Sequence, residues 1–322
     1  MCGNNLKKHI MTFLCLALTM CLMSGAAISH AQSDTSVHYH AMDRALSENN
    51  DDEALKHFYL LVSTGVSILE LGELVKIKPL SNKTYAGVCS VFERIGEKAN
   101  GIYTVRYIFR SKDADDVVQK RCLAVLEKWG DQEITSDLIG IFVDKKREIN
   151  LRIVAAKALK ELAPDRAKEQ FIKILDSPDE MLIHYKSVQY LSGFNTPEVS
   201  SAIEKHILNP NASELSRERG IFSFVSVENK RYKDEPSHLA TAKKRAGTVV
   251  GMMGRLFEQT SIPDPVAERA IKILSSPGVA NDGGKTLLKH ISESSKSENV
   301  RSAAVHALTI PEGHPYDNNL PE

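Results

Sequence analysis

The feature that most restricts how this chain can fold is an internal repeat with a period of about 33 residues, a length typical of helical repeats. Residues 164–178 and 263–277 lie three such periods apart and agree at nine of their fifteen positions. Bulky apolar residues recur at intervals of 33, 32 and 33, namely Leu126, Leu159, Leu191 and Phe224. A unit of this length cannot bury its own apolar face, so neighbouring units must stack on one another.

Each unit has the pattern of two helices. Between residues 151 and 162 the apolar side chains recur three and four residues apart, which is the stripe of an amphipathic helix. Pro164 then starts a second helix, which ends near Asp176. Residues 101–110 have strand propensity, but the repeat register aligns them with the helix predicted at 134–143. We therefore expect a helix there as well.

The units resemble HEAT repeats. In these, one helix is followed by a turn that holds Asp and Pro, and then by a helix that opens with Val-Arg and continues with alanines and a closing leucine. The match is good at residues 151–162 (LRIVAAKALKEL) and 300–308 (VRSAAVHAL). It is looser where Gln119 and His184 take the arginine position. The resemblance implies that Arg152 ties successive repeats together. It also implies an all-α fold, a right-handed α-α superhelix (HEAT-like solenoid) of about five or six helical pairs, which binds another protein or peptide.

The pattern divides the chain into six segments. These are a cleaved signal peptide (1–31), an N-terminal helical cap (32–83), HEAT-like repeats (84–225), an insertion with one longer helix (226–262), C-terminal HEAT-like repeats (263–309) and a disordered tail (310–322). Within the cap, a polar start precedes two predicted helices near 51–63 and 65–76. The insertion is recognised by a charged stretch and by a predicted helix at 237–259.

The N-terminal segment 1–31 has the features of an export signal. Two lysines precede an apolar run at 10–23, which is too short to span a membrane, and a small-x-small site follows. Cleavage between Ala31 and Gln32 would leave a periplasmic or secreted protein whose mature chain has no membrane span. A lipoprotein anchored at Cys21, which follows a sequence similar to a lipobox, is the minor alternative.

The predicted mature chain keeps two cysteines, Cys89 and Cys122. They lie on neighbouring repeats, one residue out of register. An exported protein meets oxidising conditions, which permit a disulfide between them. Two buried thiols that pack as small apolar side chains are the other interpretation.

Nothing in the sequence predicts a catalytic, cofactor-binding or metal-binding residue. The motifs H-E-x-x-H, C-x-x-C and G-x-S-x-G do not occur, and His38 and His40 have no further ligand nearby in a polar segment expected to be solvated. Lys+Arg and Asp+Glu balance at 41 each, and this argues against nucleic acid as a partner. An enzyme or ligand-binding protein, with a pocket between the insertion and the concave face, and an envelope structural protein are the alternative functions.

Three residues are candidates for contact with a partner because they share one position of the repeat. They are Lys157, Gln189 and Phe222. An exposed phenylalanine is a typical interface anchor. We expect, however, that the helix at 237–259 covers Phe222 and makes it part of the core.

Overall fold

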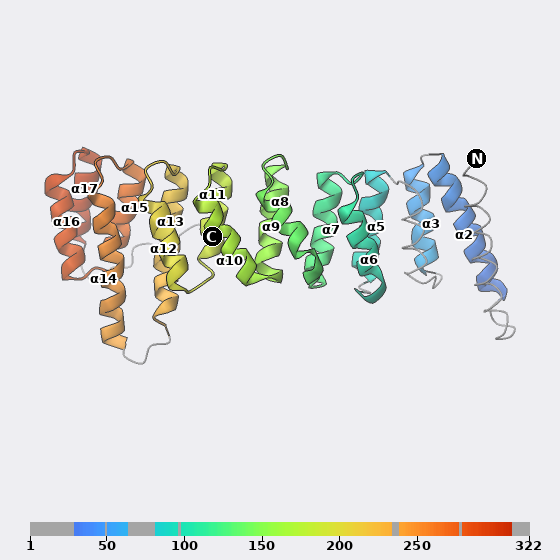
Figure 1. Cartoon of the computed structure of the whole chain (residues 1–322), viewed down its shortest axis with the longest axis horizontal. Coiled ribbons are helices and arrows are strands. Elements are labelled where there is room, and N and C mark those ends of the chain that lie inside the picture. The colour runs from blue at the N-terminus through green and yellow to red at the C-terminus, as the bar shows by residue number, and fades with distance from the viewer. Residues whose placement is uncertain are drawn as a thin grey trace. The chain divides into compact units, whose positions relative to one another are not determined.

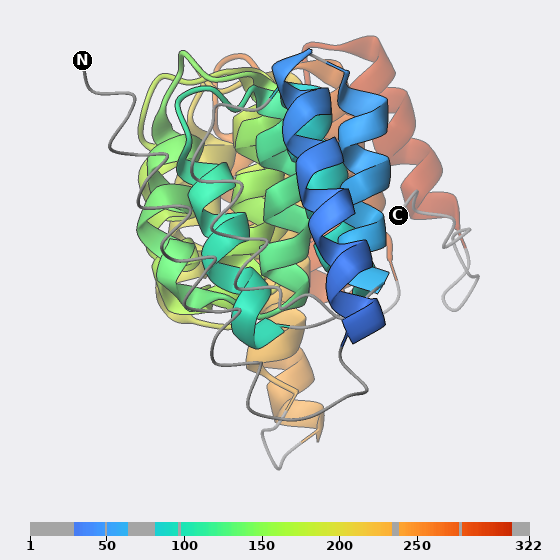
Figure 2. The same cartoon turned by 90° about the vertical axis from the view of Figure 1, so that its right-hand side faces the viewer.

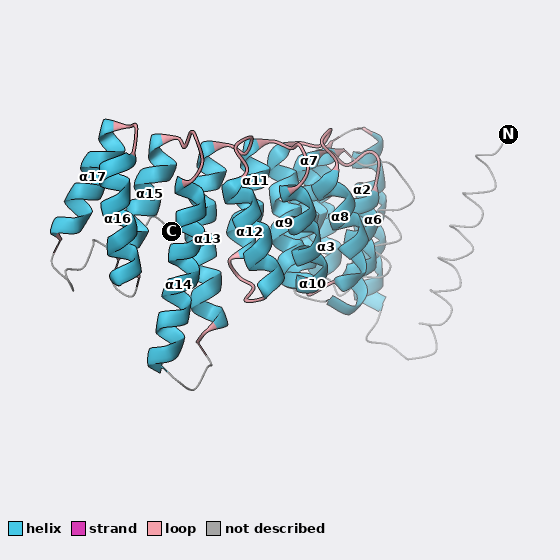
Figure 3. Cartoon of the chain, turned by 60° about the vertical axis from the view of Figure 1, so that its left-hand side comes forward, coloured by secondary structure: helices cyan, strands magenta, loops and turns pink. Residues whose placement is uncertain are grey.

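The structure is a computed structural model of the chain and describes six stretches of it: 29–48, 50–63, 81–95, 98–233, 238–276 and 279–310. Within these stretches every regular element is a helix, and no strand is present (Figure 3). The predicted all-α class is therefore confirmed. No helix in these stretches is long and apolar enough to cross a membrane.

The chain forms two compact units, divided after Asp131. The described helices of unit 1 are α2 (Ser29–Ser47), α3 (Asp51–Ser63), α5 (Asn82–Ile95), α6 (Lys98–Arg110) and α7 (Asp116–Lys128). Figure 2 shows α2 and α3 side by side, and α5 packs against both α3 and α7. The helix α6 confirms that the repeat register, not strand propensity, decides the structure of residues 101–110.

Unit 2 contains the remaining described helices. They are η1 (Gln132–Ile134), α8 (Thr135–Val143), α9 (Ile149–Leu162), α10 (Pro164–Leu175), α11 (Met181–Leu191), α12 (Pro197–Leu208), α13 (Glu214–Arg231), α14 (His238–Phe257), α15 (Asp264–Leu274), α16 (Asp282–Ser294) and α17 (Glu298–Thr309). The odd-numbered helices from α9 pack in succession, and so do the even-numbered helices from α8 (Figure 1). The described part of unit 2 is thus a two-layered row of five helical pairs, each of which contacts its neighbours, as expected of a helical repeat.

The described helices bear on three of the predicted segments. Residues expected to form a polar start are helical in α2, where Met42 and Ala45 are buried. The boundary predicted at 83 falls inside α5, which packs on α3 before it and on α7 after it. The predicted insertion is not an addition to the repeats: α14 packs between α12 and α16 in the even layer. The helix predicted at 65–76 lies outside the described residues.

One polar contact recurs at the same place in three of the repeats, while His184 at this position contacts the carbonyl of Ser177 instead. A side chain near the start of an odd-numbered helix donates to the carbonyl oxygen ten residues earlier, in the last turn of the preceding helix. The pairs are Gln119 to Phe109 (3.1 Å), Arg152 to Phe142 (2.9 Å) and Arg217 to Ile207 (2.8 Å). These bonds satisfy carbonyl groups that a helix end leaves without a partner. They fix how each helix turns into the next.

Arg152 also joins one repeat to the next, as the resemblance implied. Its two terminal nitrogens donate to the two carboxylate oxygens of Asp179, at 3.0 and 2.6 Å. Both side chains are completely buried. Asp179 lies in the loop before α11, so the pair connects α9 to the following repeat through a bidentate, charge-assisted contact.

Candidate protein-binding face

The odd-numbered layer of unit 2 presents a row of partly exposed side chains. On α11 and α13 they lie one, two and five residues after the position of Arg152, on α9 only the fifth position contributes, and Arg269 is added from α15. We call them the odd-helix face: Lys157, Tyr185, Lys186, Gln189, Glu218, Arg219, Phe222 and Arg269. The three predicted candidates therefore lie in one layer, on α9, α11 and α13.

Tyr185 on α11 is the first aromatic centre of this face. The guanidinium carbon of Arg219 on α13 lies 5.7 Å from the centre of its ring, and Nζ of Lys186 lies at the same distance. Lys186 also donates to the side-chain oxygen of Gln189 at 3.1 Å. A cation within about 6 Å of an aromatic ring is attracted to its face. These contacts hold two positive charges beside one partly exposed aromatic ring.

Phe222 on α13 is the second aromatic centre, and the prediction that it belongs to the core is wrong. Its side chain is half-buried, and Arg269 of α15 lies over it with the guanidinium carbon 4.4 Å from the ring centre. The core position belongs to Phe224, which is 1% exposed. The physical reason is that α14 lies in the even layer, away from the face on which Phe222 lies. Arg269 is also held by Glu218, with 2.8 Å between Nε and Oε1.

Positive charge exceeds negative charge on the odd-helix face. Four cations lie there, one on each of α9, α11, α13 and α15, with Glu218 as the only carboxylate of the set. In the even layer, α10 and α12 together carry four cations and four carboxylates, whereas α14 carries four cations and no carboxylate. A local excess of one sign attracts a partner of the other sign even when the whole protein is neutral. The face therefore favours an anionic partner.

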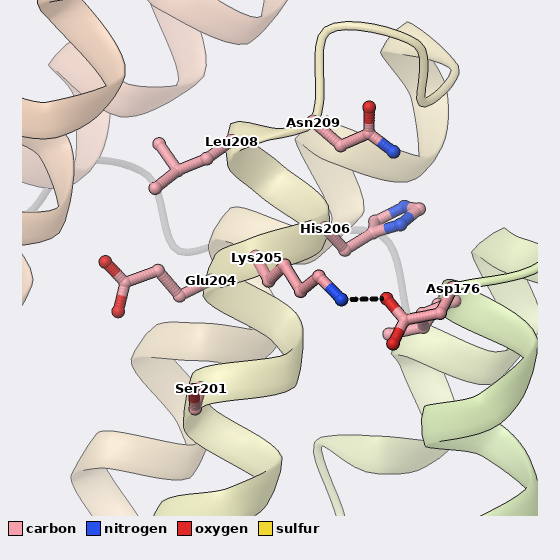
Figure 4. Close-up of a pocket in the computed structure, with 8 residues that line it drawn as sticks. Asp176, Ser201, Glu204, Lys205, His206, Leu208 and Asn209 are labelled. Atoms are coloured by element: carbon pink, nitrogen blue, oxygen red, sulfur yellow. Dashed lines mark ion pairs between the residues drawn. The ribbon is translucent and has the colours of Figure 1, made fainter.

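The even layer contains a pocket of about 450 Å³ between α10 and α12 (Figure 4). Lys205 reaches Asp176 at 2.7 Å in this view, and Glu204 accepts from Nε of Arg255 on α14 at 2.7 Å. Three of its charged groups are thus already paired with protein groups. None of the residues that line it lies in the range 226–262, so it is not the pocket between the insertion and the concave face that the sequence offered as an alternative.

His206 lines this pocket but is held inside the protein. It is 2% exposed, and its Nε2 lies 3.0 Å from the hydroxyl of Ser216. Burial, and then the nearby His184, lower the pKa of His206 to about 4, so the ring is neutral at pH 7. Ser201, the hydroxyl residue of the pocket, lies away from this ring in Figure 4. The serine that does contact the ring, Ser216, is completely buried, so His206 is not paired with a hydroxyl that lines the pocket, as a nucleophile and its base would be.

Among the described residues, no three His, Cys, Asp or Glu side chains come together as a metal site would require. His40 on α2 is exposed, as expected of a solvated segment, whereas His38 on the same helix is half-buried. Nδ1 of His38 is 3.1 Å from Nδ1 of His57 on α3. His57 in turn lies 3.1 Å from Oε1 of Glu53.

Two further predicted positions have defined places. Cys89 on α5 and Cys122 on α7 are both completely buried, and their sulfur atoms are 2.7 Å apart.

Ala31 and Gln32 lie in the first turns of α2, so the predicted cleavage site is helical in the uncleaved chain. Cys21 lies outside the described residues. Cleavage stays a prediction.

Comparison with known proteins assigns no family to this chain. No protein-family model matches it, and no curated protein matches it. A solved structure of human deoxyhypusine hydroxylase in complex with glycerol is similar at 10% sequence identity and a TM-score of 0.32, over 87% of this chain and 97% of that one. Agreement of this size assigns neither a family nor an activity.

Proposed function

We propose that this protein is a non-catalytic, HEAT-like scaffold that binds an extended acidic segment of another protein on the odd-helix face. The observation that carries the proposal is the row of four cations, one on each successive odd-numbered helix. They are Lys157, Lys186, Arg219 and Arg269. Two of them flank Tyr185 and one lies over Phe222, so cations and aromatic rings occupy the same surface. Arginine and aromatic residues are the side chains that most often dominate the energy of binding.

The spacing of the helices predicts the spacing of acidic residues in the partner. Packed helices lie about 8–10 Å apart, and an extended chain advances about 3.3–3.6 Å per residue. One step from helix to helix therefore corresponds to roughly three residues of an extended peptide. Side chains three residues apart point the same way in a polyproline II segment, which has three residues per turn and rises about 3.1 Å per residue. A carboxylate at every third position of such a segment would therefore present one charge to each cation in turn.

Export is part of the proposal. It is supported by the lysines, the short apolar run and the small-x-small site that ends at Ala31. In this account the partner is a periplasmic or secreted protein that carries an acidic segment.

A displayed library of random peptides, selected on the purified protein, tests the proposed binding mode. We expect enrichment of segments whose Asp and Glu recur at intervals of three. Arg219→Glu reverses one charge of the face and should abolish the enrichment. The control, Lys205→Glu, makes the same change of charge on the even layer and should not. Circular dichroism establishes that both variants are folded. Selection of segments without acids, or equal selection by Arg219→Glu, would contradict the proposal.

Binding of a small molecule in the α10–α12 pocket is the second candidate function. Its volume of about 450 Å³ lies within the range of small-molecule sites, about 300–1,000 Å³. A thermal-shift screen with small metabolites tests it. A ligand that stabilises the wild type but not a Ser201→Trp variant, whose larger side chain would fill the pocket, would favour this function over the first.

A further inference from the structure

The two cysteines among the described residues of unit 1 lie closer than unbonded atoms pack. The sulfur atoms of Cys89 and Cys122 are 2.7 Å apart, and neither side chain is exposed. Unbonded carbon atoms are in optimal contact at about 3.5–4.0 Å, and sulfur is the larger atom. A disulfide has its sulfur atoms about 2.0 Å apart, so a small movement of either side chain makes the bond.

A second contact between residues one repeat length apart fixes the register of α5 against α7. The backbone N–H of Asp115, at the start of α7, donates to the side-chain oxygen of Asn82, at the start of α5, at 3.1 Å. This pair and the cysteine pair are both separated by the length of one repeat. The cysteines therefore meet because positions 33 residues apart lie side by side here, in place of the one-residue offset that the sequence comparison indicated. Their proximity does not depend on one flexible side chain.

We propose that Cys89 and Cys122 form a disulfide that joins α5 to α7 when the chain folds in the presence of a disulfide oxidant. One cysteine loses its proton and attacks a sulfur atom of the oxidant, which forms a mixed disulfide and releases one thiolate. The second cysteine, also deprotonated, attacks the mixed disulfide, forms the Cys89–Cys122 bond and releases the second thiolate. Both released thiolates take up a proton. The protein is oxidised by two electrons, and the oxidant is reduced to two thiols.

Burial determines when this exchange can occur. The hydrogen bond with Cys89, and then burial, raise the pKa of the Cys122 thiol well above its ordinary value. The reactive thiolate is thus disfavoured once α5 and α7 have packed, and no reagent reaches either sulfur atom. The bond forms before packing is complete, and afterwards it resists reduction. It acts as a structural link between repeats and not as a redox switch.

Peptide mapping tests the bond directly. The full chain is unfolded, reduced, refolded with oxidised and reduced glutathione, alkylated and digested with trypsin without reductant. Trypsin releases Cys89 within residues 84–94 and Cys122 within residues 122–128. We expect these two peptides as one linked species that separates on reduction. Two alkylated, unlinked peptides, or a link to a cysteine within the segment 1–31, would overturn the proposal.

Two further measurements separate a structural link from a switch. The bond closes a loop of one repeat and so restricts the unfolded chain. We therefore expect the oxidised chain to melt roughly 10 °C above the reduced chain. The Cys89→Ala/Cys122→Ala variant should melt at one temperature with or without reductant. The native oxidised chain should keep its bond in dithiothreitol until denaturant is added. Rapid reduction without denaturant would contradict the structural role. This proposal is independent of the odd-helix face, so either can fail alone.

Discussion

Replacing Asp179 with alanine should destabilise unit 2 by about 3 kcal/mol. The substitution leaves the guanidinium group of Arg152 completely buried, with the carbonyl of Phe142 as its remaining close acceptor. Removing one partner of a buried pair costs about 3–5 kcal/mol, because the other charge is left uncompensated. We expect the lower end of this range. Glu180, whose Oε1 already lies 3.8 Å from Arg152, can compensate part of the charge.

Urea unfolding followed by far-ultraviolet circular dichroism measures this change. The matched control is Asp176→Ala, the same substitution three residues earlier. It breaks the ion pair between Asp176 and Lys205, whose side chains are 54% and 69% exposed, respectively. Exposed pairs contribute about 0–1 kcal/mol, so the control should unfold close to the wild type. A variant with Arg152→Met and Asp179→Leu together should recover part of the loss. If Asp179→Ala unfolds like Asp176→Ala, the buried pair does not tie the repeats together.

The same pair predicts a pH dependence. Burial raises the pKa of Asp179, but the hydrogen bonds from Arg152 and from the backbone N–H of Glu180, with the charge of Arg152, outweigh it and leave the pKa below 3.8. A carboxylate with a lowered pKa stabilises the fold above its unfolded pKa, and this stabilisation is lost as the pH falls through the folded pKa. The difference between wild type and Asp179→Ala should therefore be constant near neutrality and shrink below about pH 4.

Three further predictions follow from the described contacts. The pKa of His206 is lowered from 6.5 to about 4, so between these pH values only the unfolded chain takes up the proton. The free energy of unfolding should therefore fall by about 3 kcal/mol from pH 7 to pH 4. His206→Gln should reduce that fall in urea titrations. Phe224→Ala should cost about 3–5 kcal/mol and Phe222→Ala clearly less, because only the first ring is in the core; equal losses in thermal unfolding would contradict the assigned positions. Intact-mass measurement of the protein from its native compartment should give an N-terminus at Gln32, and an uncleaved or lipid-modified chain would reject export by this route.

The helical repeat could be predicted because its period of about 33 residues reflects packing between units, which is not determined by any single segment. Residues 101–110 favour a strand by propensity, but in α6 they carry four fully or nearly buried apolar side chains at helical spacing. Tertiary packing therefore outweighs local preference there. The role of Arg152 was expected from the resemblance to HEAT repeats, and its side chain reaches both the carbonyl of Phe142 in α8 and Asp179 in the loop before α11.

Other features could not be read from the sequence, because they depend on how separate helices meet. The helix α2 is polar on average, and only its contact with α3 shows which of its side chains are buried. A second example is α14, which looks like an insertion because of the charged stretch before it. In the structure it takes the ordinary place of a repeat helix.

The binding face was found only in part from the sequence. Comparison of one repeat position identified Phe222 but not Tyr185, Arg219 or Arg269, which lie at neighbouring positions or in the last compared helix. The ring of Tyr185 meets Arg219 on the next odd-numbered helix, and Phe222 meets Arg269 in the same way, so neither contact has a local signal. The position two residues after Arg152 carries Lys186 and Arg219 in the later repeats, and the position one residue after it carries Tyr185 on α11.

Binding of a spaced acidic peptide tests the central claim most directly. Two synthetic peptides of equal length and composition are compared by calorimetry, one with glutamate at every third position and one with the same glutamates in a single block. The account predicts that the spaced peptide binds more tightly, that its affinity falls as salt is raised, and that Arg219→Glu weakens it at least tenfold while Lys205→Glu does not. Equal affinity for both peptides, or binding that is unchanged in Arg219→Glu, would contradict the claim that the odd-helix face recognises an extended acidic segment.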